Sequence, residues 1–388
     1  MTAISPRIAA ELADLVYQIK RPTKSGDFRI DSSPDVYRSF TFDLSEGPVS
    51  GSSGGFLGLF QKTTGFAMIG RGKGFYEGHI VVAIRGTHSS HDWLTNGNVG
   101  LSVGLSGSSV HSGFNDTFES MRPVLDRVLT PHIRGSKFKP IHCVGHSLGG
   151  ALASLTADWI RIRFDRPVNL YTFGAPRVGL SGFARKTSFG VDRIYRCTHG
   201  ADPVPKVPLW PFIHAPLDGS EYRLDNDRGI SIAAHSMNRN STPGYRNTAN
   251  SDDGQTLQKM SQGFLNSPVR LSYQNRHQAS FSGYWADKIS AALITLLKDA
   301  GYYSAIIAQA GIGTTLTFYD LVARTLEDIA KASTRFAEQT AGLLGHMLVF
   351  AGKVAVQVVN LTYQFIKWVF DQTTSELYRS VKQALDRN

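Results

Sequence analysis

The pattern of hydrophobic and polar residues changes in character near residue 285. Before it, short apolar runs alternate with segments whose apolar residues recur at helical spacing. Apolar runs of about four to eight residues, rich in β-branched side chains, are typical of buried strands. The pattern predicts strands over residues 36–44, 65–70, 79–84, 141–144, 167–173 and 193–198, and helices over residues 115–129 and 148–163. Strands alternating with helices predict a mostly parallel sheet covered by helices, an α/β fold.

The last hundred residues have a different, helical pattern. Two rows of apolar residues recur seven positions apart: Val322, Ile329, Phe336, Leu343 and Phe350, then Met347, Val354, Leu361 and Trp368. Such rows predict long amphipathic helices. The sequence therefore predicts two domains, an α/β domain over residues 1–285 and an all-α module over residues 286–388.

Three roles remain open for this C-terminal module. It could simply pack against the α/β domain, dock on a membrane or a protein partner, or span a membrane. Two stretches without a charged residue, on either side of Lys353, hold fourteen and thirteen residues. A spanning helix needs about 20 apolar residues, so the span is the weakest of the three.

The N-terminal segment predicts an amphipathic helix rather than a secretion signal. Residues 1–20 contain Glu11 and Asp14 and lack a continuous apolar core. A standard secretory signal has such a core. We therefore expect synthesis in the cytoplasm without a standard signal peptide, with export by a signal-independent route or association with a membrane left open.

The charge of the chain indicates which partners to expect, and its cysteines indicate whether disulfide bonds are expected. The net charge is +10, and residues 286–388 carry ten Lys or Arg against nine Asp or Glu, so residues 1–285 carry +9. A basic body is attracted to anionic surfaces such as phospholipid headgroups. No basic run is interleaved with aromatic residues, so nucleic acid is not an expected partner. The two cysteines, Cys143 and Cys197, lie in predicted strands and are expected to be reduced core residues.

Residues 145–149, Gly-His-Ser-Leu-Gly, carry the strongest chemical signal. They match the pattern Gly-x-Ser-x-Gly between a predicted strand and a predicted helix. A serine on such a tight turn is held in a strained conformation with its oxygen above the sheet edge. A loop that merely turns the chain would explain the five residues alone, but not the flanking strand and helix. The pattern predicts Ser147 as a nucleophile, with the N–H of Leu148 at the helix start facing an oxyanion.

A second loop follows the strand that ends at Ile84. Ligand-contacting loops lie at the carboxyl ends of strands in α/β sheets. Thr87 could offer a backbone N–H and a hydroxyl to an oxyanion, or it could cap a helix. His88 and His91 lie three positions apart, but no third ligand is evident. We expect no metal and no cofactor.

Six segments together resemble the class 3 lipase family, of the fungal triacylglycerol lipase type within the α/β-hydrolase fold. They are residues 84–87, 92–93, 110–114, 145–152, 171–179 and 202–205. They follow the order of the family and span roughly residues 65–240. The combination is specific, whereas the pentapeptide alone is not.

The resemblance implies roles for individual residues. Ser147 would be the nucleophile and Asp202 the acid of a catalytic triad. The histidine follows the acid in chain order in this fold. This leaves His214, His235 and His277, of which His235 is favoured because residues 233–237 resemble the family's histidine loop.

The same resemblance implies the surroundings of the triad. Thr87 would join Leu148 in the oxyanion hole. His146 and His214 would line the site, and Trp93 and Leu94 would belong to a lid over residues 88–105. The chain departs from the family pattern at residues 238–240, Asn-Arg-Asn, where an aromatic residue is expected close behind the histidine.

The expected function is hydrolysis of lipid esters by a serine lipase or phospholipase through an acyl-enzyme. Its substrate would be a lipid or phospholipid at a membrane surface, and an antibacterial secreted effector would fit these features. The alternative is a membrane-perturbing or protein-interaction protein that acts through its C-terminal helices. A Ser147→Ala variant that still permeabilises vesicles would favour this alternative.

Overall fold

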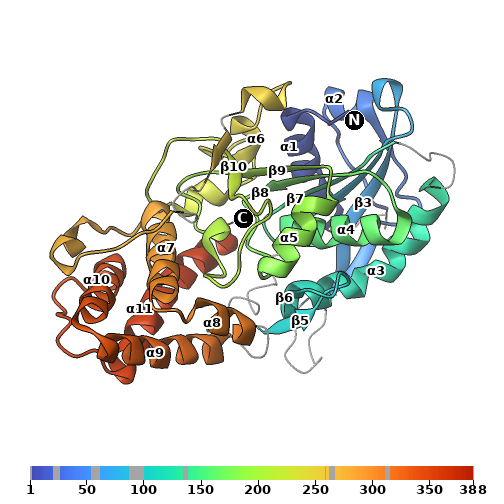
Figure 1. The fold of residues 1–388 in the computed structure, drawn as a ribbon. Coiled ribbons are helices and arrows are strands. Elements are labelled where there is room, and N and C mark those ends of the chain that lie inside the picture. The colour runs from blue at the N-terminus through green and yellow to red at the C-terminus, as the bar shows by residue number, and fades with distance from the viewer. Residues whose placement is uncertain are drawn as a thin grey trace.

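The computed structural model describes residues 2–20, 27–53, 62–86, 100–133, 139–257, 259–261, 267–310 and 315–387. It has an α/β body with helices on both faces of one large sheet. A group of helices from the C-terminal part of the chain lies to one side of this body (Figure 1). The α/β-hydrolase type of fold and the appended helical segment agree with the predicted fold class.

In the described part of the chain, the large sheet has nine strands. They are β1 (Phe40–Phe42), β2 (Val49–Ser53), β3 (Lys62–Gly72), β4 (Ile80–Ile84), β7 (Ile141–His146), β8 (Val168–Phe173), β9 (Arg193–Thr198), β10 (Ser220–Arg223) and β11 (Lys259–Ser261). The order is β1-β3-β4-β7-β8-β9-β10-β11, with β2 also paired to β3. The pairs from β4 to β10 are parallel, and those at both edges are antiparallel. The strands β5 (Leu101–Val103) and β6 (Ser109–His111) form a small separate hairpin.

The central strands are apolar on both faces because helices cover both. Helices α3 (Ser112–Ile133), α4 (Leu148–Phe164) and α5 (Ser181–Gly190) lie on one face, and α1 (Pro6–Leu15) with the 3₁₀ helix η1 (Val16–Lys20) lies on the other (Figure 1). In β4, Val82 packs with the first group and Val81 with the second. This confirms the predicted central strand, since a strand covered on both faces needs no alternation.

The predicted strand over residues 36–44 was wrong over most of its length. Residues Pro34–Ser39 form helix α2, and the strand β1 begins only at Phe40. The Ser33 side chain accepts a hydrogen bond from the N–H of Val36, and Pro34 occupies the first turn. This helix start overrides the β propensity of the residues that follow.

The C-terminal helices form a unit with its own core. They are α7 (Gly283–Asp299), α8 (Tyr303–Ala310), α9 (Thr315–Ala332), α10 (Thr334–Phe350) and α11 (Tyr363–Arg387). The first seven-spaced row lies on α9 and α10, where Val322, Leu343 and Phe350 are buried. The second row was wrong as a helical stripe, because residues 351–362 are not helical and Val354 is 50% exposed.

The predicted domain boundary falls inside α7, within its first turn. Residues ahead of it already belong to the core of the helical unit, since Leu271 and Ala279 pack there. The 3₁₀ helix η10 (Tyr273–Gln278) packs against α10. We propose that the helical unit begins near residue 267.

The lengths of these helices bear on the membrane alternatives. Among the described residues, no single helix is long and apolar enough to cross a membrane. The pair α7 and α8 meets that criterion only together, and the two helices are bent by 118°. The apolar faces of α7, α9, α10 and α11 contribute to the core of the helical unit.

Candidate active site

Ser147 lies on the tight turn between β7 and α4. Its backbone has φ 59° and ψ −132°, outside the usual regions for a residue with a side chain. Such strain persists only where the surroundings hold it. The N–H of Ser147 donates to the carbonyl of Phe173 on the neighbouring strand, at 2.9 Å.

The glycines on either side of Ser147 allow this turn to pack closely. A Cβ at Gly145 would lie 2.1 Å from the Gly149 carbonyl oxygen. A Cβ at Gly149 would lie 2.2 Å from the Ile84 carbonyl oxygen. Both distances are far below van der Waals contact, so the pattern Gly-x-Ser-x-Gly is a steric requirement of this crossing.

The structure brings Ser147, His235 and Asp202 together in one chain of hydrogen bonds. The Nε2 atom of His235 lies 2.9 Å from the Ser147 Oγ. Its Nδ1 atom lies 2.9 Å and 3.1 Å from the two carboxylate oxygens of Asp202. His235 ends the 3₁₀ helix η7 (Ile232–His235), and Asp202 follows β9. All three side chains are buried, with residue exposures of 4%, 0% and 1% respectively.

The environment of Asp202 fixes the tautomer of His235. Burial alone would raise the pKa of the Asp202 carboxyl, but the neighbouring His235 and several hydrogen bonds outweigh it and lower that pKa. The ionised carboxylate can only accept, so His235 Nδ1 carries the proton. Its Nε2 lone pair is then free to accept the proton of the Ser147 hydroxyl.

Tyr245 completes the support of Asp202 and is a residue that the sequence did not indicate. Its hydroxyl donates to the Asp202 carboxylate at 2.8 Å and accepts from the N–H of His199 at 3.0 Å. It lies in the short helix α6 (Tyr245–Thr248), beyond the segment 238–240 that lacked an aromatic residue. The aromatic residue that contacts Asp202 thus lies ten residues after His235.

His146 forms hydrogen bonds to the loop that carries His235 and to the N-terminal segment. Its Nε2 donates to the main-chain carbonyl of His235 at 2.7 Å, and its Nδ1 accepts from the Tyr17 hydroxyl at 2.8 Å. Burial, with the neighbouring His235, lowers the pKa of His146 to about 3. His146 is thus a neutral bridge between the N-terminal segment and the loop that carries His235.

The buried histidines predict an acid-sensitive fold. Burial lowers the pKa of His142, as of His146, to about 3, against an ordinary value of 6.5. Below pH 6.5 the unfolded chain binds protons that the folded protein does not, so stability is fully present above pH 6.5 and falls with pH toward 3. We expect the free energy of unfolding in urea to drop by roughly 1–3 kcal/mol per pH unit between pH 6.5 and 4.5.

The pH range from 6.5 to 4.5 distinguishes the effect of the buried histidines on stability from that of the buried carboxylate of Glu221. Burial raises the pKa of Glu221, but the positive charges of Arg196, Lys206 and Arg223 outweigh it and lower that pKa to about 2. Glu221 therefore begins to destabilise the fold only below about pH 4.5. A free energy of unfolding that stays constant from pH 7 to pH 4.5 would contradict the assignment of neutral, buried histidines.

The other residues predicted for the site are distributed differently. His214 is half-buried and donates to the Pro205 carbonyl at 2.7 Å, and His277 is exposed on η10. Leu148 is the first residue of α4, so its N–H lies at the helix start. Thr87, Trp93 and Leu94 lie outside the described residues. Gly86, the last described residue before them, borders Ser147, since a Cβ there would lie 3.3 Å from the Ser147 Cβ.

Residues 81–212 match the model of the family "Lipase (class 3)". This stretch includes most of β4, the turn at Ser147, and Asp202. Residues 81–212 belong to the class 3 lipase family. The relatives of this class 3 lipase domain include the "Secreted mono- and diacylglycerol lipase 1" of Fusarium solani, 36% identical over 160 residues that cover 39% of this chain and 47% of that protein.

Two further relatives come from other kingdoms. The "Toxin TseL" of Vibrio cholerae is 36% identical over 106 residues, or 27% of this chain and 16% of that protein. The "Phospholipase A(1) DAD1, chloroplastic" of Arabidopsis thaliana is 30% identical over 151 residues, or 33% of each. The chain spans about half the length, or less, of these curated relatives. The similarity therefore concerns the class 3 lipase domain.

The expectation of synthesis in the cytoplasm without a standard signal peptide, with export by a signal-independent route or membrane association left open, was wrong. The Fusarium relative is named a secreted lipase. The segment used for that prediction is α1 with η1, whose apolar side chains Leu12, Val16 and Ile19 are buried against the sheet. Its composition reflects packing in the folded body and does not report a compartment.

Proposed function

We propose that this protein is a serine-dependent ester hydrolase that acts on lipids, with Ser147 as nucleophile, His235 as base and Asp202 as acid. The observation that carries the proposal is the buried chain of hydrogen bonds from Ser147 Oγ through His235 to Asp202. A serine hydroxyl is a weak nucleophile until a base accepts its proton. The proposed base has its free nitrogen 2.9 Å from that hydroxyl.

The proposed reaction follows from these positions. His235 Nε2 takes the Ser147 proton as Oγ attacks the ester carbonyl, and Asp202 stabilises the imidazolium that forms. The N–H of Leu148, at the start of α4, and that of Thr87 would stabilise the oxyanion, a donor typically worth about 2.7–4 kcal/mol. His235 then protonates the leaving alcohol, and water, activated by the same histidine, releases the fatty acid.

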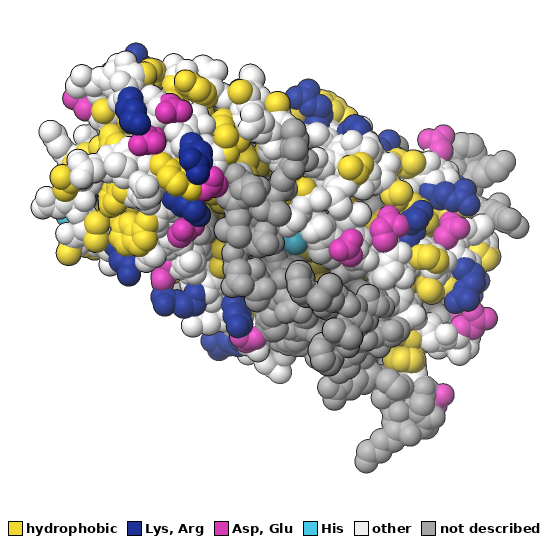
Figure 2. Space-filling view, turned by 90° about the horizontal axis from the view of Figure 1, so that it is seen from below, with side chains coloured by type: hydrophobic (Ala, Val, Ile, Leu, Met, Phe, Trp, Pro, Cys, Tyr) yellow, Lys and Arg dark blue, Asp and Glu magenta, His cyan; other side chains and the backbone are white. Residues whose placement is uncertain are grey.

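The substrate class is supported by the family and by the charge of the body. The relatives named a mono- and diacylglycerol lipase and a phospholipase A(1) act, by their names, on lipid esters. The net charge of +9 on residues 1–285 supports phospholipid at an anionic membrane surface over neutral fat. On the face in Figure 2, basic, acidic and hydrophobic side chains are interspersed.

Covalent labelling combined with a lipid panel tests the proposal. A fluorophosphonate probe, which reacts with activated serines, is expected to modify Ser147 alone, as read by peptide mass spectrometry. Fatty acid release from phosphatidylglycerol, diacylglycerol and triacylglycerol then identifies the substrate. Labelling at another serine, or none together with no release from any lipid, would sink the proposal.

A more specific proposal is that the protein is toxic to bacteria. The relative named Toxin TseL supports this proposal. Growth of a bacterial host that expresses the wild type or Ser147→Ala provides the comparison. Growth arrest by both proteins would favour a membrane-perturbing or interaction protein that acts through the C-terminal helices. The burial of the apolar faces of these helices instead supports a role in packing.

A further inference from the structure

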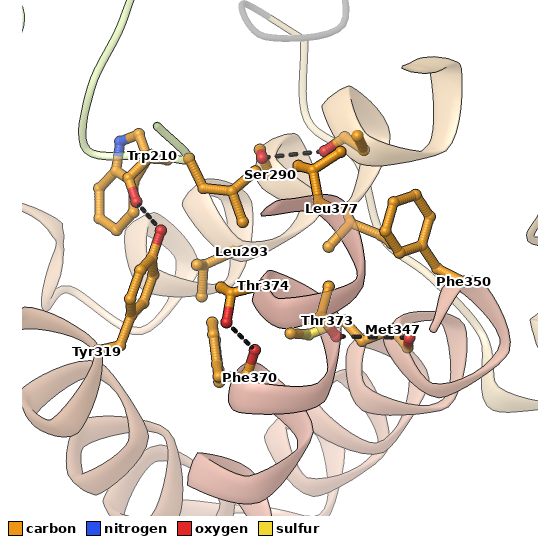
Figure 3. A pocket seen from close by; sticks show the side chains of 13 residues that line it. Trp210, Ser290, Leu293, Tyr319, Met347, Phe350, Phe370, Thr373, Thr374 and Leu377 are labelled. Atoms are coloured by element: carbon orange, nitrogen blue, oxygen red, sulfur yellow. Dashed lines mark hydrogen bonds between the residues drawn. The ribbon is translucent and has the colours of Figure 1, made fainter. Parts of the chain in front are cut away.

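Two neighbouring cavities lie where the α/β body meets the helical unit. The inner cavity, of about 460 Å³, lies among α7, α9, α10 and α11 and ends at Leu209 and Trp210 (Figure 3). The outer cavity, of about 970 Å³, lies between α5, residues 210–219 and the end of α7. Neither is lined, within the described part of the chain, by the three residues of the proposed triad.

The inner cavity presents an apolar surface. Leu293, Met347, Phe350, Phe370 and Leu377 point into it (Figure 3). Its four hydroxyl-bearing side chains donate to main-chain carbonyls, at 2.5–3.0 Å: Ser290 to Ala286, Tyr319 to Trp210, Thr373 to Val369 and Thr374 to Phe370. A cavity whose polar groups are already satisfied holds water poorly, so it suits an aliphatic chain.

The outer cavity combines apolar walls with positive charge. Phe212 and Ile294 contribute to its walls, while Arg185 and Lys298 are exposed basic residues at its lining. Within the described residues, neither of these two cations has an acidic side chain at ion-pair distance. The first residue of α5, Ser181, also lines it, and no side chain caps that helix N-terminus. Both features favour an anionic group there.

The two cavities meet at shared residues. Trp210 and Ser290 line both of them. The apolar inner cavity and the cationic outer one are therefore neighbours at Trp210 and Ser290. A molecule with a negatively charged end and a long apolar end matches a cationic outer cavity beside an apolar inner cavity.

We propose that the two cavities together bind a single-chain anionic amphiphile, that is, an anionic head on a long aliphatic chain. Arg185 and Lys298 bind the head in the outer cavity. The chain passes between Trp210 and Ser290 into the inner cavity. This site lies at the junction of the two parts of the protein and does not depend on the proposed chemistry of Ser147.

Calorimetry on the Ser147→Ala variant of the whole chain tests the proposal without hydrolysis. The probes, used below their micelle concentrations, are laurate, lauroyl lysophosphatidic acid, neutral monolaurin and the shorter octanoate. Laurate or the lysophosphatidic acid is expected to bind once per chain, and the tighter of the two identifies a carboxylate or a phosphate head. Monolaurin and octanoate should each bind at least tenfold more weakly than laurate. Equal binding of octanoate and laurate, or no saturable binding, would overturn the proposal.

Substitutions of the residues assigned to the site test where the amphiphile binds. Arg185→Ala with Lys298→Ala, both at exposed positions, should weaken laurate binding at least tenfold and leave monolaurin unchanged. The control, Arg379→Ala with Lys382→Ala, removes the same charge from the exposed side of α11 and should have no effect. Ser290→Leu narrows the passage and should weaken laurate more than octanoate, and the chain-length series decides the question if that variant does not fold. Laurate binding that both double variants leave equally tight would show that Arg185 and Lys298 do not bind the head, and it would overturn the proposal.

Discussion

Ser147→Ala and His235→Ala are each expected to lower kcat on a lipid ester by about 10⁴- to 10⁶-fold and to leave the protein folded. The first removes the attacking oxygen, and the second removes the group that accepts its proton at 2.9 Å. Because these residues act as one unit, the double variant should be little worse than either single variant. The measurement is the initial rate of fatty acid release, with circular dichroism and urea unfolding as the test of folding.

His214→Ala is the matched control for the base. His214 follows Asp202 in the chain as His235 does, but its Nε2 is engaged with the Pro205 carbonyl. Its removal should therefore cost less than about tenfold in kcat, since it breaks one hydrogen bond of a neighbouring loop. A loss in His214→Ala as large as that in His235→Ala would refute the assignment of the base. Retained turnover in Ser147→Ala would refute the assignment of the nucleophile.

Local signals account for the residues of the site that the sequence could predict. The strand, the strained turn and the helix around Ser147 are adjacent in the chain, so their pattern is visible in it. His235 was preferred from its neighbouring residues, and it lies within hydrogen-bond distance of Ser147 although 88 positions separate them. Tyr245 and Tyr17 could not be found in this way. Their partners Asp202 and His146 are 43 and 129 positions away, and only the folded chain brings them together.

The errors in the predicted fold also have local physical causes. The second seven-spaced row continued a helical pattern through Val354, but α10 ends at Phe350 and Gly352 has φ +71°. A glycine in this conformation ends a helix because side chains are disfavoured there. The spacing of hydrophobic residues alone does not reveal where a helix ends. The same limit applies to residues 36–44, where the Ser33 cap and Pro34 decide the structure.

Val381→Asp is expected to destabilise the whole protein by about 3–5 kcal/mol, because it places an unpaired charge in a buried apolar contact. Val381 lies on α11 and is 0% exposed. With Leu377, Ala384 and Leu385 it forms a stripe at helical spacing that packs against Val204, Val207 and the segment at Ile230 and Ile232. The free energy of unfolding in urea measures the effect, and Gln383→Asp, exposed on the same helix, is the control.

The same contact connects the helical unit to the proposed catalytic loops. Val204 lies two residues after Asp202, and Ile232 three residues before His235, so the end of α11 packs directly beside both (Figure 1). The first half of α11, with Ile366 and Phe370, is buried among the other C-terminal helices. A shift of a few tenths of an ångström in either loop lengthens the hydrogen bonds on which the proposed proton transfer depends.

Val381→Ala separates this effect from global unfolding. It should cost only about 1–2 kcal/mol and remain folded at 25 °C. We expect its kcat to fall while Gln383→Asp keeps wild-type kcat, because only the former loosens the loops at Asp202 and His235. A Val381→Ala protein that is folded and has unchanged kcat would mean that α11 only stabilises the structure. A Val381→Asp protein as stable as Gln383→Asp would mean that this end of α11 does not pack on the loops at all.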